Sequence, residues 1–266
     1  AELFTADIAH PITYGINKGD LKAQNVKLTP GGSRYQAVYE GRELRIECHI
    51  PGEFNVYNSL AAAAVGGAVG LTKEQIEKGI SALRRVEGRM EPLNEGQDFD
   101  VIVDYAHTPD SFEKLFKDLR PVVKGKLIVL FGSAGRRDEA KRAVQGRLAG
   151  EYADEVIVTE EDDRDIDGNE IMNQIAGGAE EAGKVRDKNL FLVHDRPEAI
   201  KFAISRANKG DTVLFLGKGH EKDILRNGPR AAELRHLQQD DHNPDRVTEH
   251  PWDEIATVRE ALRSIP

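Results

Sequence analysis

The feature that most constrains the fold is a regular alternation of apolar runs and helical patterns through the second half of the chain. Apolar runs typical of buried strands lie at residues 101–103, 127–131, 155–158, 190–193 and 212–216, and helical patterns lie near 109–120, 138–152, 169–182 and 196–208. Strands that alternate with helices form a parallel sheet, because each helix carries the chain back across one face of it. The pattern predicts an α/β fold with a doubly wound, mostly parallel sheet.

The first strand and helix of this alternation place polar side chains at a sheet edge. Thr108 is a natural N-cap and Pro109 a natural first helical residue, so the helix begins directly after a short turn. The turn that precedes Thr108 holds Asp104, Tyr105 and His107. Because this turn follows the carboxyl end of a strand, where parallel sheets bind their ligands, the three side chains are candidates for a site.

The first half of the chain has a different pattern. Short alternating runs at residues 12–16, 21–28, 35–39 and 44–50 predict antiparallel strands. An Ala- and Gly-rich run then extends to Gly70, and its small residues predict a helix that is buried on all sides. Composition changes again in the polar stretch 84–97, so we expect a domain boundary near Gly88.

Two signals mark the helices of this first half. Asn55 and Asn58 lie near the start of the Ala-rich helix, where an Asn is either a helix cap or a side-chain amide available to a ligand. Thr72, followed three residues later by Gln75, predicts a capping box for a second helix that extends to Leu83.

Charge and composition narrow the possible partners. The formal net charge of −9 argues against a nucleic acid held by general electrostatics. No run of about 18 apolar residues is present, and the N-terminal residues do not resemble a signal peptide. Cys48 is the single cysteine, which excludes a disulfide within the chain and favours a reducing compartment. We therefore expect a cytoplasmic protein with no nucleic-acid or membrane partner.

Polar segments follow four of the five predicted strands, at residues 104–107, 132–138, 159–164 and 217–221. They share one edge of a parallel sheet and can converge on one ligand. Their cations are Arg136, Arg137, Arg164 and Lys218, and their anions are Glu161, Asp162 and Glu221. Both signs together suit a zwitterion such as an amino acid, although any one of these loops alone would be typical of a solvated surface. Residues 194–197, after the fourth strand, fit an ordinary N-cap and first helical turn.

The polar stretch at residues 227–250 contains no recognisable catalytic or metal-binding motif. Residues 227–250 predict a surface loop, and a final helix is expected at 254–263. His236, His242 and His250 do not have the spacing of a standard metal site. Neither nucleotide-phosphate fingerprint, G-x-G-x-x-G or G-x-x-x-x-G-K-[ST], occurs in the sequence.

Several motifs taken together resemble the Mur ligases, most specifically the MurE type. They are NVYN at 55–58 before an Ala-rich helix, GRME at 88–91, DYAHTPD at 104–110, a Gly/Arg loop with Arg137, Lys141 and Arg142, and GKGHE at 217–221. The resemblance implies the tail of a central ATPase domain at residues 1–88 and a C-terminal, Rossmann-like domain at 89–266 that binds an amino acid.

The resemblance also implies a reaction. Mur ligases of this type use ATP and Mg²⁺ to join a diamino acid to UDP-MurNAc-L-Ala-D-Glu through an acyl phosphate, in the synthesis of a peptidoglycan precursor. In the family, the P-loop, most Mg²⁺ ligands and a carbamylated lysine belong to the part of the enzyme that precedes the matching residues. We therefore expect this chain to be inactive by itself. Alternatives are a sister ligase of the folylpolyglutamate or cyanophycin type and a non-catalytic amino-acid-binding module.

The same resemblance implies roles for individual residues. Nucleotide contacts are expected at Asn55, Asn58, Arg89, Asp104, Tyr105 and His107. The amino acid is expected at Arg137, Asp162, Asp163, Arg164, Gly217 and Glu221, with Lys141, Arg142, Lys218 and His220 in support. The family's Asn-Pro is Asp162-Asp163 here. Arg164 favours meso-diaminopimelate over L-lysine, because a guanidinium binds a side-chain carboxylate.

Overall fold

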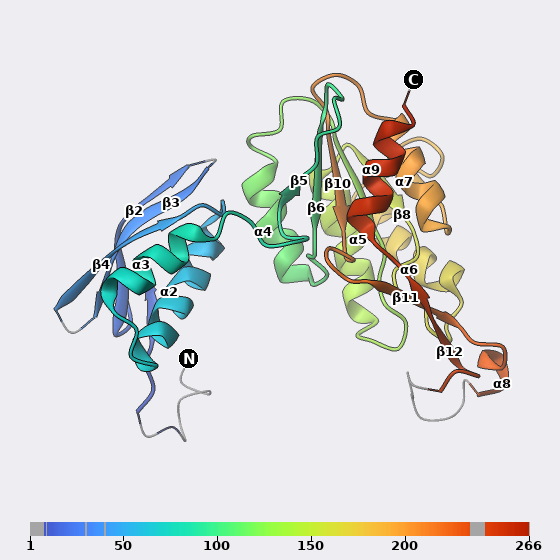
Figure 1. The fold of residues 1–266 in the computed structure, drawn as a ribbon. Helices are drawn as coiled ribbons and strands as arrows, with labels where there is room; N and C mark the ends of the chain where they lie inside the picture. Colours follow the sequence, from blue (N-terminus) through green and yellow to red (C-terminus); the bar gives the residue numbers. More distant parts are fainter. Residues whose placement is uncertain (1–7, 9, 30, 40, 235–242, 266) are drawn as a thin grey trace. The chain divides into compact units, whose positions relative to one another are not determined.

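The computed structural model describes residues 8, 10–29, 31–39, 41–234 and 243–265 (Figure 1). The chain divides into two compact units, residues 1–86 and 87–266. Each unit has its own hydrophobic core. The two units are therefore described separately.

The first unit contains a four-stranded sheet in the order β1-β2-β3-β4. Its strands are β1 (Tyr14–Ile16), β2 (Leu21–Thr29), β3 (Gly32–Tyr39) and β4 (Arg42–Cys48). The antiparallel pairing expected from the alternating runs is confirmed for β2 with β3 and for β3 with β4. It is wrong for β1, which pairs parallel to β2. An alternating pattern determines which side chains are buried but carries no information about strand direction.

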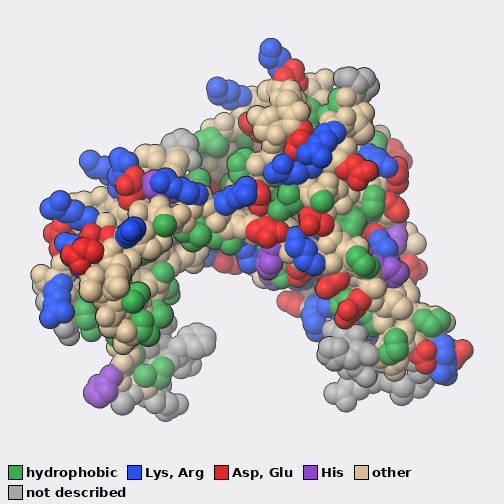
Figure 2. All heavy atoms as spheres, viewed as in Figure 1, with side chains coloured by type: hydrophobic (Ala, Val, Ile, Leu, Met, Phe, Trp, Pro, Cys, Tyr) green, Lys and Arg blue, Asp and Glu red, His purple; other side chains and the backbone are tan. Residues whose placement is uncertain are grey.

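Two helices complete the first unit, α2 (Glu53–Ala68) and α3 (Lys73–Ala82). The expectation that α2 is buried on all sides is wrong, since Val65 and Val69 are 63% and 69% exposed. Val56 and Leu60, on its other face, are fully buried. Apolar side chains accordingly reach the surface over α2 in Figure 2. Small residues therefore indicated a closely packed helix face but not how many faces are covered.

The capping box predicted for α3 is confirmed. The Thr72 hydroxyl accepts a hydrogen bond from the Gln75 amide, and the Gln75 side chain accepts one from the Thr72 amide. This reciprocal pair satisfies two of the donors that every helix leaves unpaired at its start.

The second unit contains a six-stranded sheet in the order β5-β6-β10-β7-β8-β9. Its strands are β5 (Glu91–Pro92), β6 (Asp100–Asp104), β7 (Leu127–Phe131), β8 (Glu155–Val158), β9 (Leu190–Leu192) and β10 (Thr212–Leu216). The five predicted strands form the parallel part. The short edge strand β5 was not predicted and pairs antiparallel to β6. The predicted doubly wound sheet is thus confirmed.

Helices cover both faces of this sheet (Figure 1). They are α4 (Pro109–Leu119), α5 (Ala140–Tyr152), α6 (Gly168–Glu181), α7 (Arg196–Ser205) and α9 (Glu254–Arg263). Within β7, Leu127, Val129 and Phe131 pack with α4, α5 and α6, whereas the alternate residues Ile128 and Leu130 pack with α7 and α9. Strands buried on both faces have continuous apolar sequences, which explains why these strands were easy to predict.

The stretch expected to be a surface loop is more ordered than its composition suggests. Within its described residues, 227–234 and 243–250, it includes the last residue of β11 (Asp223–Asn227), the short helix α8 (Ala231–Leu234) and most of β12 (Val247–Pro251), and β11 pairs antiparallel to β12. Arg246, 2% exposed, lies 2.8 Å from a carboxylate oxygen of Asp165. For these described residues the expectation is wrong, because backbone pairing, a buried ion pair and the buried side chains of Ala231 and Val247 organise them. His236 and His242 lie outside the described residues, and His250 contacts Thr248.

Candidate active site

The polar segments that follow β6, β7, β8 and β10 meet at the carboxyl edge of the sheet in the second unit. The Gly135 amide, after β7, donates to the carbonyl of Asp162, after β8, at 2.8 Å. The carboxylate of Glu161 lies against Gly217, after β10, so closely that a Cβ at Gly217 would come within 2.6 Å of it. Gly217 also has a φ of 100°, which favours glycine. The predicted convergence of these segments is confirmed.

Tyr105 is the centre of an aromatic and charged cluster. Its hydroxyl donates to the Glu221 carboxylate at 2.7 Å, and the Arg89 guanidinium carbon lies 4.3 Å from the centroid of its ring. The rings of His107 and His220 lie 4.7 and 4.9 Å away between centroids. Burial and then the bond to Glu221 raise the pKa of Tyr105 to about 12. Tyr105 is thus a neutral hydrogen-bond donor near pH 7 that joins the segment after β6 to the segment after β10.

Lys218 links the anions of the site. Its side chain is fully buried, and its ammonium lies 3.0 Å from Asp162 and 2.6 Å from Glu221. Burial alone would lower the pKa of Lys218, but these two carboxylates outweigh it and raise that pKa. The ammonium is therefore charged and fixes the segment after β8 to the segment after β10.

Asp104 binds backbone amides of two neighbouring segments. It is buried, and its two carboxylate oxygens accept from the amides of Met90 and Ala106, each at 2.7 Å. Burial raises the pKa of Asp104, while these amide bonds act in the opposite direction. Its contacts hold residue 90 against the end of β6, which places the neighbouring Arg89 over the Tyr105 ring.

The arginines expected to bind the amino acid differ in exposure. Arg164 is 5% exposed, and its guanidinium donates to the carbonyl of Gly135 at 3.1 Å. Arg137 is exposed. Arg136 pairs through two hydrogen bonds, of 3.0 and 2.8 Å, with Asp165. Burial would raise the pKa of Asp165, but the bonds from Arg136 and Arg246 lower it. Part of the predicted cationic set therefore stabilises the loops themselves.

Glu161 is the least satisfied anion of the site. It is 6% exposed, and its Oε2 has no hydrogen-bond partner within the described part of the chain. Burial raises the pKa of Glu161, against the positive charges of Lys141 and Lys218. A buried carboxylate oxygen without a donor costs free energy, and a cationic ligand group would offset that cost.

The supporting residues of α5 have contacts of two kinds. Lys141 donates through its ammonium to the His107 carbonyl at 3.1 Å. Arg142 is fully buried and donates to Gln174 at 2.6 Å and to the Ala134 carbonyl at 3.1 Å. Lys141 therefore binds the segment after β6 to α5, and Arg142 binds α6 and the segment after β7 to α5.

Asn55 and Asn58 belong to α2 of the first unit. Their interpretation as helix caps is wrong, because the N-cap residue is Gly52 and no side chain caps the helix. The Asn55 amide instead donates to the Pro51 carbonyl at 2.6 Å, and the Asn58 amide donates to Asn55 Oδ1 at 2.9 Å. The two amides thus support each other within the first turns of α2.

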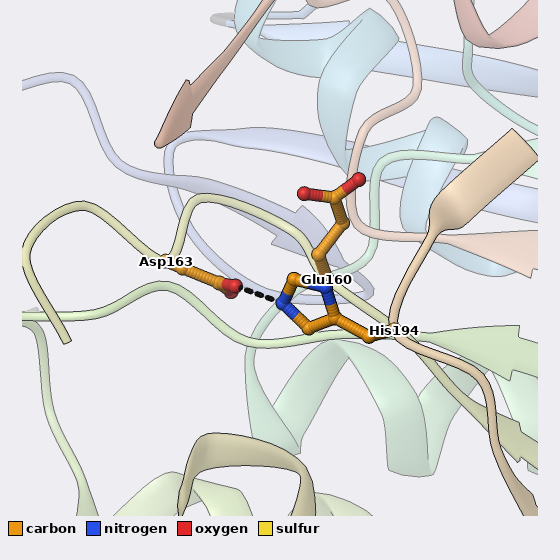
Figure 3. A group of neighbouring side chains, drawn as sticks. All are labelled: Glu160, Asp163 and His194. Carbon is orange, nitrogen blue, oxygen red and sulfur yellow. Dashed lines mark hydrogen bonds and ion pairs between the residues drawn. The ribbon is translucent and has the colours of Figure 1, made fainter. Parts of the chain in front are cut away.

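Sequence reasoning missed His194. Asp195 is the N-cap of α7, as expected, but the preceding His194 contributes Nε2 to a 2.6 Å hydrogen bond with Asp163 (Figure 3). The available signal was position, since His194 follows the end of a parallel strand as the other site residues do. Glu160, beside the His194 ring, belongs to the same cluster.

The residue types of this cluster could hold a metal ion, and their ligand atoms lie within 4.8 Å of one another. However, Arg226 already donates to both oxygens of Glu160, at 2.8 and 2.6 Å. A guanidinium that neutralises one of three ligands disfavours a cation at the same place. The arrangement is better described as a network of ion pairs.

In the described residues, no helix is both long and apolar enough to cross a membrane.

Comparison with protein families gives two matches. Residues 88–219 match a Mur ligase, glutamate ligase domain, and residues 2–66 match a Mur ligase middle domain. Together the two matches cover most of the chain, and they occur in the same order as the two compact units.

Individual relatives agree with this assignment. A UDP-N-acetylmuramyl-tripeptide synthetase of Roseiflexus sp. is 40% identical over 97% of this chain and 47% of its own length. The UDP-N-acetylmuramoyl-L-alanyl-D-glutamate--2,6-diaminopimelate ligase 1 of Clostridium acetobutylicum is 39% identical over 79% of this chain and 43% of its own length. The chain thus spans about half or less of these curated relatives.

A solved structure of a UDP-N-acetylmuramoyl-L-alanyl-D-glutamate--2,6-diaminopimelate ligase aligns with 98% of this chain and 50% of its own, with a TM-score of 0.55 and 28% identity. A folylpolyglutamate synthase of Mycobacterium tuberculosis, at 18% identity and a TM-score of 0.58, shares the fold. The domain matches, the relatives and the structural likeness agree, and the chain belongs to the Mur ligase family.

Proposed function

We propose that this chain carries the amino-acid site and part of the nucleotide site of an ATP-dependent ligase. The ligase would add a diamino acid, meso-diaminopimelate in preference to L-lysine, to UDP-MurNAc-L-Ala-D-Glu. The observation that carries the proposal is the chain of contacts from Tyr105 through Glu221 and Lys218 to Asp162. It joins three of the four converging segments into one charged surface at the carboxyl edge of the sheet.

In this proposal residues 1–88 are the rear part of the central ATPase domain and 89–266 are the amino-acid domain. ATP with Mg²⁺ supplies the phosphoryl group that makes the acceptor carboxylate an acyl phosphate. The neutral amine of the diamino acid then forms a bond to the acyl carbon, the bond to the phosphate oxygen breaks, and the amine loses a proton. Because neither phosphate-binding fingerprint occurs in these 266 residues, we expect this chain to need the front half of a ligase for turnover.

The residues of the chain fit this assignment through their charge. Glu161 offers a buried carboxylate oxygen that receives no hydrogen bond from the residues the structure describes, which suits the ammonium group of an amino acid. Glu221 is held in place from two sides, by Tyr105 and Lys218, and keeps partial exposure for a ligand. These residues would bind and orient the amino acid, so that its reacting amine is presented to the acyl group at little further entropic cost.

For the nucleotide, Arg89 and His107 supply the groups that the chain can contribute in the second unit. Arg89 is exposed and stacked on Tyr105, so that its donors can reach a phosphate or ribose oxygen. Asn55 and Asn58 would contribute amides on the adenine side from the first unit. The described contacts leave one oxygen, on Asn58, and further amide hydrogens for such contacts.

The preference for diaminopimelate would come from Arg164. Its guanidinium lies in the segment after β8, next to Asp162 and the Gly135 carbonyl. A guanidinium binds a carboxylate through two parallel hydrogen bonds, and lysine has no carboxylate at its side-chain end. Asp162 stands where the family has Asn, and its charge is balanced here by Lys218.

The proposal is tested by calorimetric titration of meso-diaminopimelate and of L-lysine into the chain and its Arg164→Ala variant. We expect the variant to lose binding of diaminopimelate by about tenfold or more, as for the loss of a charged hydrogen-bond pair. Arg186→Ala is the matched control, because Arg186 precedes β9 and lies at the opposite end of that strand. Unchanged affinity in Arg164→Ala would contradict the assigned role.

Two alternatives are separated by the same titration. A sister ligase of the folylpolyglutamate type predicts binding of L-glutamate and none of diaminopimelate. A non-catalytic binding module predicts binding of the diamino acid, but no ligation after the front half of a related ligase is supplied. Tight binding followed by ligation supports the proposed function alone.

A further inference from the structure

The segment from Glu160 to Asp165 carries several of the proposed amino-acid contacts and is held by ion pairs with other segments. Arg226 on β11 binds Glu160, and Lys218 after β10 binds Asp162. The third contact comes from the segment after β9, where His194 binds Asp163. Of these cations, only the imidazole has an ordinary pKa inside the physiological range.

The two partners of this pair differ in exposure. Asp163 is 3% exposed as a residue, and its Oδ1 has no hydrogen-bond partner in the described ranges. The side chain of His194 is 47% exposed. Figure 3 shows the carboxylate of Asp163 directed at the imidazole edge. Protons can therefore reach the histidine from solvent, whereas the carboxylate depends on the histidine for its counter-charge.

Gly168, the first residue of α6, lies against the His194–Asp163 pair. A Cβ at Gly168 would lie 2.1 Å from His194 Nε2 and 2.2 Å from Asp163 Oδ2. A larger residue at this position would displace the paired side chains, so Gly168 lies in close contact with the pair. A neutral histidine can still donate from Nε2 to the carboxylate, but it no longer supplies the positive charge that offsets the buried charge of Asp163.

The charges around His194 come from two other segments and from its own. Asp163 and Glu160 follow β8, Arg226 lies on β11, and Asp195 is the next residue along the chain. The hydrogen bond from Asp163 is the main cause of a raised pKa for His194, and the charge of Glu160 adds to it. Burial and the positive charge of Arg226 act in the opposite direction. The contribution of the pair is thus fully present below the pKa of an unfolded-state histidine and is lost as pH rises through the higher, folded-state pKa.

We propose that protonated His194 is a positioning residue that holds Asp163, and with it the segment from Glu160 to Asp165, in the arrangement that binds the amino acid. His194 acts through Asp162 and Arg164 and does not touch the substrate. This inference rests on the proposed function for its ligand, but the ion pair between His194 and Asp163 is measurable without any ligand. The amino acid would accordingly bind more tightly below the pKa of His194 than above it.

The first experiment follows the imidazole resonances of His194 by NMR in the full chain and in its Asp163→Asn variant. We expect a midpoint above the ordinary value of about 6.5 in the wild type and a lower midpoint in the variant. His250→Gln removes a histidine on β12, so the missing signal identifies the His250 resonances. The His194 midpoint should be unchanged in this variant. A wild-type midpoint at or below the ordinary value would overturn the inference, whether or not an amino acid binds.

The second experiment measures the affinity for meso-diaminopimelate by calorimetry between about pH 6 and 9, a range chosen to include the histidine titration. We expect the wild type to lose about threefold to tenfold in affinity across the midpoint found by NMR. His194→Gln should bind with the weak, high-pH affinity below the midpoint as well. His194→Arg, which keeps a positive charge throughout, should flatten the profile at higher affinity, and His250→Gln should reproduce the wild-type profile.

The outcomes distinguish the two proposals. Absence of binding by the wild type at every pH overturns the proposed function, while the NMR midpoint still tests the ion pair between His194 and Asp163. Binding with the same pH profile in wild type and His194→Gln overturns the positioning role and leaves the proposed function intact. If His194→Gln fails to fold, the wild-type midpoint and the His194→Arg profile decide.

Discussion

Two buried ion-pair regions in the second unit share similar residue types but differ in how completely their polar atoms are satisfied. Arg196, at the start of α7, donates to both oxygens of Glu254 at 2.9 and 2.7 Å and to the carbonyls of Glu160 and Leu216. At the carboxyl edge, Lys218 satisfies Asp162 and Glu221, yet neighbouring Glu161 and Asp163 each keep an oxygen for which the described residues supply no donor.

This difference in hydrogen bonding distinguishes a network that stabilises the fold from one that is suited to binding a ligand. Arg196 and Glu254 are fully buried and bind α7 to α9, with no atom left for a ligand. The unsatisfied oxygens at the carboxyl edge cost stability in the free protein, and a cationic ligand would recover it. Saturated polar networks therefore hold this unit together, whereas the incompletely satisfied one is suited to binding.

The largest effect on this comparison is expected from Arg196→Met. The variant leaves the Glu254 carboxylate buried without its counter-charge, so we expect the free energy of unfolding to fall by about 3–5 kcal/mol. Urea denaturation followed by circular dichroism measures it. A double variant with Glu254→Leu should recover much of the loss, since a buried pair can be replaced by apolar residues at little cost. Loss of less than about 1 kcal/mol in the single variant would show that the pair is not structural.

Lys218→Met tests the same comparison, because we expect it to change both the stability of the unit and its affinity for the amino acid. It removes the cation between Asp162 and Glu221, so we expect a smaller destabilisation, of about 2–3 kcal/mol, and loss of measurable binding of meso-diaminopimelate. The side chain of Glu221 is 30% exposed and that of Asp162 is 12% exposed, so water can solvate Glu221 in particular when the cation is absent. Urea denaturation and calorimetry on the same sample test the two parts. Unchanged binding would separate Lys218 from the site.

The smallest effect on stability, and one of opposite sign, is expected from Glu161→Gln. A carboxyl whose folded-state pKa is raised destabilises the fold as pH rises above its unfolded-state pKa, so the neutral variant should be more stable at pH 7, by about 1 kcal/mol. This gain should vanish below pH 4, where the carboxyl is protonated in both states. Affinity for the diamino acid should fall at the same time. Thermal denaturation across this pH range checks the sign, and a less stable variant at pH 7 would contradict it.

The architecture of the second unit was predictable because its signals are local and periodic. The continuous apolar sequence of β7 reports burial on both faces, and Thr108 with Pro109 defines the start of α4 through contacts within four residues. The convergence of polar segments at the carboxyl edge then follows from the parallel sheet. The weaker predictions concerned strands such as β1 and β12, whose pairing depends on backbone bonds that side-chain patterns do not encode.

The sequence by itself determined the β/α order, the helix starts and the edge at which the candidate residues meet. Only the tertiary structure decided which charges pair, because the partners lie far apart along the chain. Arg196 and Glu254 are separated by 58 residues, Arg246 and Asp165 by 81, and His194 and Asp163 by 31. The free energy of such a pair depends on burial and on distances of a few ångströms. Those quantities exist only once the sheet and its covering helices have formed.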